Sequence, residues 1–280
     1  MRRKLIRKYK AFNQDFQRSK ELFLKWFIPE IKKRFFGVKK INYKDIPIII
    51  NNYNRLEMLT KLIHSLESKG YHNLYIIDNQ STYPPLLEYY TRLPYPVYML
   101  NKNVGHLSLW ETGIFKQFKD SYYAYTDSDL EILPNCPDDF IEKFILLLQK
   151  YPKALKAGFS ICIDDLPDHY KLKEKVIEWE SVFWKEEIEP NIFKALIDTT
   201  FAVYKPYFIG EPIDPDCFCI RTGYPYSVRH LPWYMNSAKP TEEELYLKSA
   251  TTRLYDTEAK IICIVSKKGA QCIECHHKDI

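Results

Sequence analysis

The 280-residue sequence contains only eight glycines, and none of them belongs to a recognisable phosphate-binding loop. No Gly-X-Gly-X-X-Gly segment follows a strand-like run, and no Gly-Lys-Ser/Thr segment occurs. Because these motifs hold the phosphates of dinucleotides and nucleoside triphosphates through backbone N–H groups, their absence argues against Rossmann dehydrogenases and P-loop enzymes. A phosphate-containing ligand would have to be held by side chains and a metal ion.

The sequence also lacks long apolar runs. No segment approaches the ~18 consecutive apolar residues of a membrane-spanning helix, and the N-terminus has no apolar core of the kind found in secretory signals. The seven cysteines are odd in number and lie mostly in apolar segments, which is typical of reduced thiols. The sequence therefore predicts a cytoplasmic protein that does not cross a bilayer.

Charge is distributed unevenly along a chain that is otherwise rich enough in apolar residues to be globular, with 46% hydrophobic and 15% aromatic residues. Residues 1–45 hold 15 Lys and Arg but four acidic residues, whereas residues 46–280 hold 26 basic and 32 acidic residues. We therefore expect a basic appendage at 1–45 and one globular domain at 46–280.

The appendage has the pattern of a basic amphipathic helix that ends near Pro29. Its apolar residues recur at helical spacing: Leu5, Tyr9, Phe12, Phe16, Phe23, Trp26 and Phe27. Such a helix can lie on an anionic membrane surface, which would make the protein peripheral, or it can dock on its own domain or a second subunit. The sequence leaves both possibilities open. It disfavours a nucleic-acid partner, because binding to phosphates would leave the aromatic residues unused.

From residue 46 onwards, strand-like and helix-like segments alternate. The strand-like runs are 46–50, 74–77, 97–100 and 122–129, and helical patterns cover 55–69, a segment from Pro84, and 107–118. This alternation predicts an α/β fold with a mostly parallel central sheet and helices on both faces. Ligands of such sheets bind at the carboxyl ends of the strands, where each of these runs leaves a polar cluster.

Two acids, Asp127 and Asp129, end the fourth strand-like run, Tyr122-Tyr-Ala-Tyr-Thr-Asp-Ser-Asp129. In an extended chain their carboxylates would lie on one face, with Ser128 turned away, and could bind one hard divalent cation. Taken alone, the pair is equally consistent with an acidic turn that caps the next helix.

Four motifs occur in order over some eighty residues: Ile48-Ile-Ile-Asn-Asn-Tyr-Asn-Arg55, Ile76-Ile-Asp-Asn-Gln-Ser-Thr82, Asn101-Lys-Asn-Val-Gly105 and Tyr125-Thr-Asp-Ser-Asp129. Together they resemble the motifs of family 2-like glycosyltransferases of the GT-A fold. The resemblance covers the half at 46–135 well, and the presumed acceptor half at 136–265 and the tail at 266–280 poorly. The sequence departs from the commonest pattern in having Asn-Gln after Asp78, where Asp-Gly is frequent.

The resemblance implies a hexosyltransferase-type enzyme that moves a sugar from a nucleotide-sugar donor to a saccharide or lipid-linked acceptor in cell-surface polysaccharide synthesis. The diphosphate would be bridged to Asp127 and Asp129 by Mn²⁺ or Mg²⁺. The nucleotide would lie near six further residues: Asn52, Tyr53, Arg55, Asp78, Asn103 and Gly105. For the first three of these, capping and packing of the first helix is an alternative role.

Two clusters in the second half offer further candidates. Asp198 lies in a strand-like run, 195–204, where a carboxylate could act as the general base on the acceptor hydroxyl; a turn whose threonines satisfy the backbone is the alternative. In the segment 229–234, His230 could complete the metal site, Arg229 could offset diphosphate charge, and Trp233 could stack on a sugar.

Other interpretations also stay open at this point. Glu178 and Glu180 are weaker catalytic candidates, and we expect them on the exposed face of a helix. The Cys272-Ile-Glu-Cys-His-His277 segment matches a haem attachment pattern, but haem attachment needs export, and a zinc site would need further ligands. A sugar-phosphate nucleotidyltransferase would be expected to have a glycine-rich segment after the first strand, which is absent. A non-catalytic membrane adaptor with a degenerate transferase fold is the alternative from another functional class.

Overall fold

The computed structural model describes eight parts of the chain: residues 31–32, 34–35, 42–197, 200–207, 219–236, 238–250, 261–266 and 269–272. The predicted N-terminal helix, which ends near Pro29, lies outside these residues; beyond it, the backbone at 31–32 and 34–35 is helical. Asp198 and the side chains of the 272–277 segment also lie outside them.

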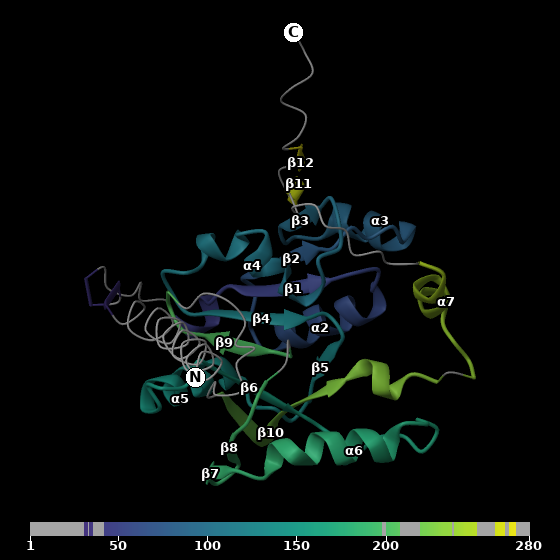
Figure 1. The fold of residues 1–280 in the computed structure, drawn as a ribbon. Helices are drawn as coiled ribbons and strands as arrows, with labels where there is room; N and C mark the ends of the chain where they lie inside the picture. Colours follow the sequence, from purple (N-terminus) through teal and green to yellow (C-terminus); the bar gives the residue numbers. More distant parts are fainter. Residues whose placement is uncertain are drawn as a thin grey trace, which may run out of the picture.

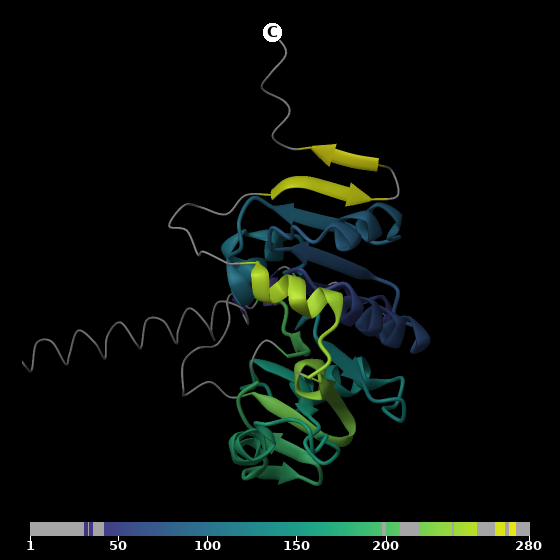
Figure 2. The same ribbon diagram turned by 90° about the vertical axis from the view of Figure 1, so that its right-hand side faces the viewer.

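Within the described residues, twelve strands form one sheet (Figures 1 and 2), in the order β12-β11-β3-β2-β1-β4-β9-β6-β10-β8-β7, with β5 paired to β10. The strands are β1 (Ile48–Asn52), β2 (Leu74–Asp78), β3 (Val97–Leu100), β4 (Tyr123–Asp127), β5 (Leu130–Ile132), β6 (Lys156–Ile161), β7 (Glu187–Glu189), β8 (Ile192–Lys194), β9 (Ala202–Tyr204), β10 (Ile220–His230), β11 (Ile261–Ser266) and β12 (Gly269–Cys272). The hairpin β11–β12 lies at one end of the sheet and β7–β8 at the other (Figure 2).

The helices come from the segments between these strands. They are α2 (Glu57–Ser68), α3 (Pro84–Arg92), α4 (Ser108–Glu111), α5 (Phe140–Lys150), α6 (Lys173–Ser181) and α7 (Glu242–Ser249), with the 3₁₀ turns η1 (Tyr43–Asp45), η2 (Gly105–Leu107), η3 (Ile114–Gln117), η4 (Val182–Trp184) and η5 (Leu231–Tyr234). The segment 107–118, which we expected to be one helix, is divided into α4 and η3 because Gly113 adopts a left-handed conformation with φ of 73°.

The neighbours β3, β2, β1 and β4 are parallel to one another, and β6 is parallel to β10. Strand β9 lies antiparallel between β4 and β6, so β6 runs in the same direction as β4. The predicted α/β fold with a mostly parallel sheet is confirmed, and the four strands predicted from sequence lie side by side at its centre.

Both faces of the sheet are covered by apolar side chains. Alternate residues of β1 point to opposite faces, because Ile48 and Ile50 pack in one hydrophobic cluster and Ile49 in another. The first cluster includes side chains from α2, α3 and α5, and the second includes side chains from α4 and η3. Two covered faces leave the strand ends as the accessible part of the central sheet, which is where polar residues gather.

Candidate active site

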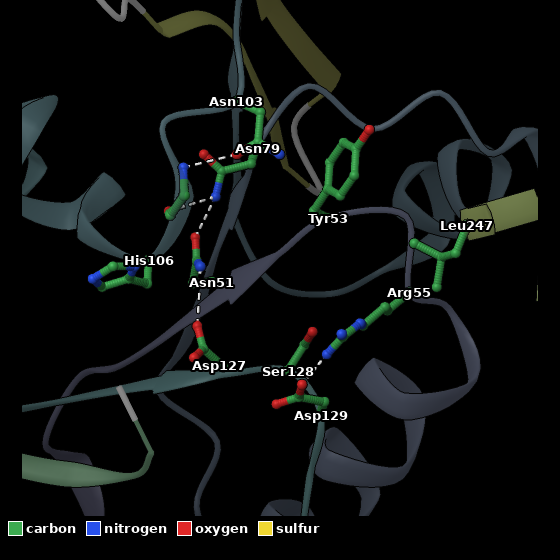
Figure 3. Close-up of a pocket in the computed structure, with 11 residues that line it drawn as sticks. Asn51, Tyr53, Arg55, Asn79, Asn103, His106, Asp127, Ser128, Asp129 and Leu247 are labelled. Atoms are coloured by element: carbon green, nitrogen blue, oxygen red, sulfur yellow. Dashed lines mark hydrogen bonds and ion pairs between the residues drawn. The ribbon is translucent and has the colours of Figure 1, made fainter. Parts of the chain in front are cut away.

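A pocket with a volume of about 250 Å³ lies at the carboxyl ends of β1 to β4 (Figure 3). The four parallel strands end at the same edge of the sheet, so the loops that follow them meet there. The lining residues are Asn51, Tyr53, Arg55, Asn79, Asn103, Gly105, His106, Asp127, Ser128, Asp129 and Leu247.

Many of the residues that the motifs single out meet in this pocket. Six of them line it: Tyr53, Arg55, Asn103, Gly105, Asp127 and Asp129. Four others, Asn52, Asp78, Arg229 and Trp233, do not line it, and His230 contacts it only through Asp129.

Asp129 is held between two cationic or potentially cationic side chains. The guanidinium of Arg55 forms an ion pair with its Oδ2 atom, and His230 Nε2 lies 3.3 Å from the same atom. Burial of Asp129 disfavours its charged form, but the contacts with His230 and Arg55 outweigh this effect and hold the pKa of Asp129 at about 2. The carboxylate is therefore ionised at neutral pH, and its charge is already opposed within the protein.

Asp127 is placed differently. It is the last residue of β4, and its Oδ1 accepts a hydrogen bond of 3.0 Å from Asn51 Nδ2 on β1. The chain then bends, and β5 turns away to pair with β10, with Leu130 opposite His230. Because the extended strand ends at Asp127, the expected alternation does not continue to Asp129, and Ser128 also lines the pocket.

Asp78 is fully buried and joins two loops at the base of the pocket. Its carboxylate accepts hydrogen bonds from Ser81 N (2.7 Å) and from Tyr90 Oη (2.8 Å), and Asn52 Nδ2 donates to the same Tyr90 hydroxyl at 2.8 Å. Burial outweighs these hydrogen bonds and raises the pKa of Asp78. The arrangement ties the loop after β1 to the loop after β2; the part of Asp78 and Asn52 in nucleotide binding stays a prediction.

Asn54 strengthens the same junction. It has a positive φ of 51°, and its Oδ1 accepts from Thr82 N (2.7 Å) and Tyr83 N (3.0 Å) at the start of α3. Its own backbone N–H donates to Ser81 Oγ at 2.8 Å. The loop that carries Tyr53 and Arg55 is therefore cross-linked by hydrogen bonds to the loop after β2 before any ligand binds.

The segment 229–234 ends β10 and continues into the 3₁₀ turn η5, of which Pro232 is the second residue. Arg229 pairs with Asp165, whose Oδ2 lies 2.7 Å from Nε, and with Glu131 at 3.4 Å. Trp233 lies edge-on to His230, with ring centroids 4.7 Å apart. Trp233 packs against His230, whereas Arg229 pairs with two acids. The contacts of Arg229 with the diphosphate and of Trp233 with the sugar stay predictions.

The expectation that Glu180 lies on an exposed helix face is wrong. Glu178 is exposed on α6, as expected, but Glu180 is buried and forms an ion pair of 2.9 Å with Arg221 of β10. The pattern of charged residues in α6 does not reveal this, because the partner that makes burial of Glu180 possible comes from a distant strand.

Sequence reasoning missed several residues of the pocket wall. Asn51 and Asn79 lie within the four motifs and His106 directly follows the third, so their positions after predicted strands were an available signal. Leu247 had no such signal, because α7 reaches the pocket from the other end of the chain. The side chain of Glu243 on α7 accepts hydrogen bonds from the N–H groups of Leu56 (2.6 Å) and Glu57 at the start of α2.

The donor set at the pocket suits a hard divalent cation that keeps most of its coordination for water and phosphate oxygens. Asp127 and Asp129 offer carboxylate oxygens at the pocket surface, and His230 adjoins Asp129. Within the described residues, no three His, Cys, Asp or Glu side chains converge as a self-sufficient metal site. These residues therefore fit a cation that is shared with a phosphate ligand, and not a cation caged by protein alone.

The chain matches the model of Glycosyl transferase family 2 over residues 48–205, from β1 to the end of β9. The match covers more than half of the 280 residues, and it includes every strand that contributes to the pocket. The chain belongs to this family, which confirms the resemblance inferred from the four motifs. The match ends before His230 and α7, so it says nothing about how they contribute.

Two solved structures show a weaker likeness. TarS from S. aureus is 17% identical with a TM-score of 0.32, and the alignment covers 45% of this chain and 24% of TarS, so the chain spans about a quarter of the length of that protein. A CMP:2-keto-3-deoxy-manno-octonic acid synthetase complexed with CTP is 8% identical with a TM-score of 0.32, covering 72% of this chain and 82% of that one. No curated protein matches the chain. In the described part of the chain, no helix has the length and apolar character required to span a membrane.

Proposed function

We propose that this protein is a metal-dependent glycosyltransferase of the hexosyltransferase type, which transfers a sugar from a nucleotide-sugar donor to a saccharide or lipid-linked acceptor. The observation that carries the proposal is the pocket at the ends of β1 to β4, where Asp127, Asp129 and Arg55 meet in a chain of glycosyl transferase family 2. Cell-surface polysaccharide synthesis at the cytoplasmic membrane face is the context we propose for this reaction.

The nucleoside would lie against Tyr53, Asn103 and Gly105, on the side of the pocket formed by the loops after β1 and β3. The positive φ of Gly105, 72°, and the open space where a Cβ would stand allow a ligand to approach the backbone closely. The diphosphate would then extend towards Asp127 and Arg55. We infer this orientation of the donor because one end of the pocket carries amides and an aromatic ring, whereas the other end carries charged side chains.

Asp127 and Asp129 would hold Mn²⁺ or Mg²⁺, with His230 as a candidate third ligand, and such a cation supplies positive charge against the leaving diphosphate. Arg55 supplies a second positive charge at the same end of the pocket. Its guanidinium pairs with Asp129 in the free protein, so it is already oriented towards the place where negative charge develops.

In the transfer step, the acceptor oxygen attacks the anomeric carbon while the bond from that carbon to the diphosphate oxygen breaks. The acceptor proton passes to a general base, for which Asp198 is the candidate from sequence, and the electron pair of the broken bond stays on the nucleoside diphosphate. The appendage at 1–45 would bring the domain to an anionic membrane surface that presents the lipid-linked acceptor.

Binding of nucleoside diphosphates tests the proposal directly. Thermal unfolding would be measured with UDP, GDP, CDP and ADP, each with and without Mn²⁺, because a bound ligand stabilises the folded state in proportion to the logarithm of its occupancy. We expect at least one diphosphate to raise the Tm, more strongly with Mn²⁺, and Asp127→Ala to reduce the increase.

A matched control is Asp120→Ala, which removes an exposed acid just before the other end of β4 and should leave the ligand-induced increase intact. The same preparations should hydrolyse the corresponding nucleotide sugar slowly in the presence of Mn²⁺. Release of pyrophosphate from a nucleoside triphosphate and a sugar phosphate would instead support the nucleotidyltransferase alternative. Absence of any response to all four diphosphates would reject the proposal.

A further inference from the structure

Asn51 stands next to Asp127 on the central strand pair of the sheet. It is the fourth residue of β1, and its register partners are Ile77 on β2 and Asp127 on β4. The side chain is only 9% exposed and lines the pocket. Asn51 thus lies opposite Asp127, the last residue of β4, and its side chain reaches Asp127 directly.

Hydrogen bonds fix both ends of the Asn51 amide. Its Nδ2 donates to Asp127 Oδ1 at 3.0 Å, and its Oδ1 accepts from Asn79 Nδ2 at 2.5 Å (Figure 3). The same Oδ1 also accepts from Ser108 Oγ at 2.7 Å. A carboxylate can only accept, and the two other neighbours donate, so one amide orientation satisfies all three contacts. The nitrogen of Asn51 must face Asp127, and the side chain cannot turn without losing several buried hydrogen bonds.

The partners of Asn51 hold the walls of the pocket. Asn79 Nδ2 also donates to the carbonyl of Gly105 at 3.1 Å, and its Oδ1 accepts from Val104 N at 3.2 Å. On the other side, Ser108 Oγ lies 3.1 Å from the hydroxyl of Tyr125, which donates to a backbone carbonyl in η2 at 2.7 Å. Asn51 therefore connects the carboxylate of Asp127 to the loop that forms the proposed nucleoside side of the pocket.

The two acids of the Asp-Ser-Asp segment consequently have unlike environments. Asp129 is paired with Arg55, whose positive charge opposes its own, and it lies beside His230. A neutral amide orients Asp127 without cancelling its negative charge, because Asn51 contributes a dipole and no net charge. An orienting contact of this kind fixes the direction of the carboxylate and adds no charge of its own.

We propose that Asn51 is a positioning residue that sets the carboxylate of Asp127 against the cation and diphosphate of the donor. The inference rests on the proposed function, since it assigns a task within the same site. Asn51 acts through Asp127, and Asn79 and Ser108 act through Asn51. The loop that contacts the nucleoside is thereby aligned with the acid that serves the diphosphate.

A double-mutant cycle tests this role. Isothermal titration with Mn²⁺ and each of UDP, GDP, CDP and ADP would be carried out on the wild type, Asn51→Ala, Asp127→Ala and the double variant. We expect Asn51→Ala to weaken diphosphate binding by about tenfold in the wild-type background, and by less than about twofold when Asp127 is already alanine, because residues that act through one another are not additive. Affinities too weak for titration would be obtained from the rise in Tm at high diphosphate concentration.

Controls separate positioning from general destabilisation. Ser160→Ala removes a buried hydrogen bond of 2.8 Å to Ser227 between β6 and β10, away from the pocket, and should lower the Tm without changing diphosphate affinity. Ser108→Ala removes one donor to Asn51 while the amide contact with Asp127 remains, so it should weaken binding less than Asn51→Ala, and again only when Asp127 is present. If Asn51→Ala does not fold, Ser108→Ala takes its place in the double-mutant cycle with Asp127→Ala.

The outcomes distinguish the inference from the function on which it rests. If the wild type binds none of the diphosphates, the proposed function is rejected. If the wild type binds but Asn51→Ala weakens binding equally with and without Asp127, or has no effect on binding, the positioning role of Asn51 is rejected and the proposed function stands. Loss of affinity that depends on Asp127 supports the role.

Discussion

Replacing Glu243 by alanine should loosen helix α7 from the pocket. The Glu243 side chain is 3% exposed, and its Oε2 accepts hydrogen bonds from the backbone N–H groups of Leu56 (2.6 Å) and Glu57 (2.8 Å) at the start of α2. Within α7, Tyr246 donates to Thr82 Oγ1 at 2.9 Å, and the next residue, Leu247, lines the pocket. Glu243 therefore caps the N-terminus of α2 and in this way holds α7, which contributes Leu247 to the pocket wall.

The expected loss follows from these contacts. Removing a side chain that caps a helix N-terminus costs about 0.5–2 kcal/mol, and here two N–H groups lose a charged acceptor, which favours the upper half, about 1–2 kcal/mol. If docking of α7 and ligand binding are linked, diphosphate affinity can fall by no more than the same free energy, or about 5- to 30-fold. Glu243→Gln keeps one acceptor oxygen and should lose less than Glu243→Ala.

Urea unfolding and titration with a nucleoside diphosphate and Mn²⁺ would measure the two effects separately. Glu242→Ala is the matched control, because it removes the same charge from the same turn of α7 at an exposed position. Its stability and affinity should stay close to those of the wild type. If Glu243→Ala behaves like Glu242→Ala, the two hydrogen bonds do not hold α7 in place and the reasoning fails.

Three further substitutions test the parts of the fold that support the site. Glu180→Ala removes the acid that pairs with the buried Arg221 and should cost about 3–5 kcal/mol in urea unfolding, whereas the double variant with Arg221→Met should recover most of this loss; an equal loss in both would contradict the account. Gly158→Ala should destabilise by about 1–3 kcal/mol or more in the same assay, because an added Cβ would stand 2.2 Å from a backbone oxygen just before β9, and a stable alanine variant would mean that β6 and β9 can separate. Burial disfavours ionisation of Asp165, but hydrogen bonds from Tyr234 and Arg229 lower its pKa below the ordinary value, so its contribution, about 0.5–1 kcal/mol for a half-exposed pair, is present above pH ~4 and is lost on further acidification. Unfolding measured between pH 3 and 7 should show that Asp165→Asn lacks this part of the pH dependence, and parallel curves for both proteins would refute it.

The first half of the fold could be predicted from sequence because its determinants are local. Ile48, Ile49 and Ile50 form a β-branched run, apolar residues in α2 recur at helical spacing, and polar residues follow each strand. Parallel strands then bring their carboxyl ends together, so motifs that are tens of residues apart meet in one pocket. This argument placed Asp127 at the site, whereas Tyr53 was placed there by the resemblance of the four motifs to a known family.

The contacts that sequence could not predict are those made between distant segments. Glu243 reaches Leu56 across 187 positions, and no local pattern indicates such a pairing. The burial of Asp78 depends on Tyr90, whose hydroxyl could equally have pointed to solvent. Patterns of polarity show which side chains can lie at a strand end, whereas packing between remote elements decides which of them face the pocket.

The bend between β4 and β5 attaches the two acids to different parts of the sheet. Asp127 keeps register with β1, whereas the carbonyl of Asp129 accepts a hydrogen bond of 2.8 Å from Leu231 N, next to the end of β10. The distance between the two carboxylates therefore depends on the position of β10 relative to β1. A shift between the first and second halves of the chain would change the distance between the carboxylates of Asp127 and Asp129. A molecule that binds to β10 and moves it would therefore alter the pocket without entering it.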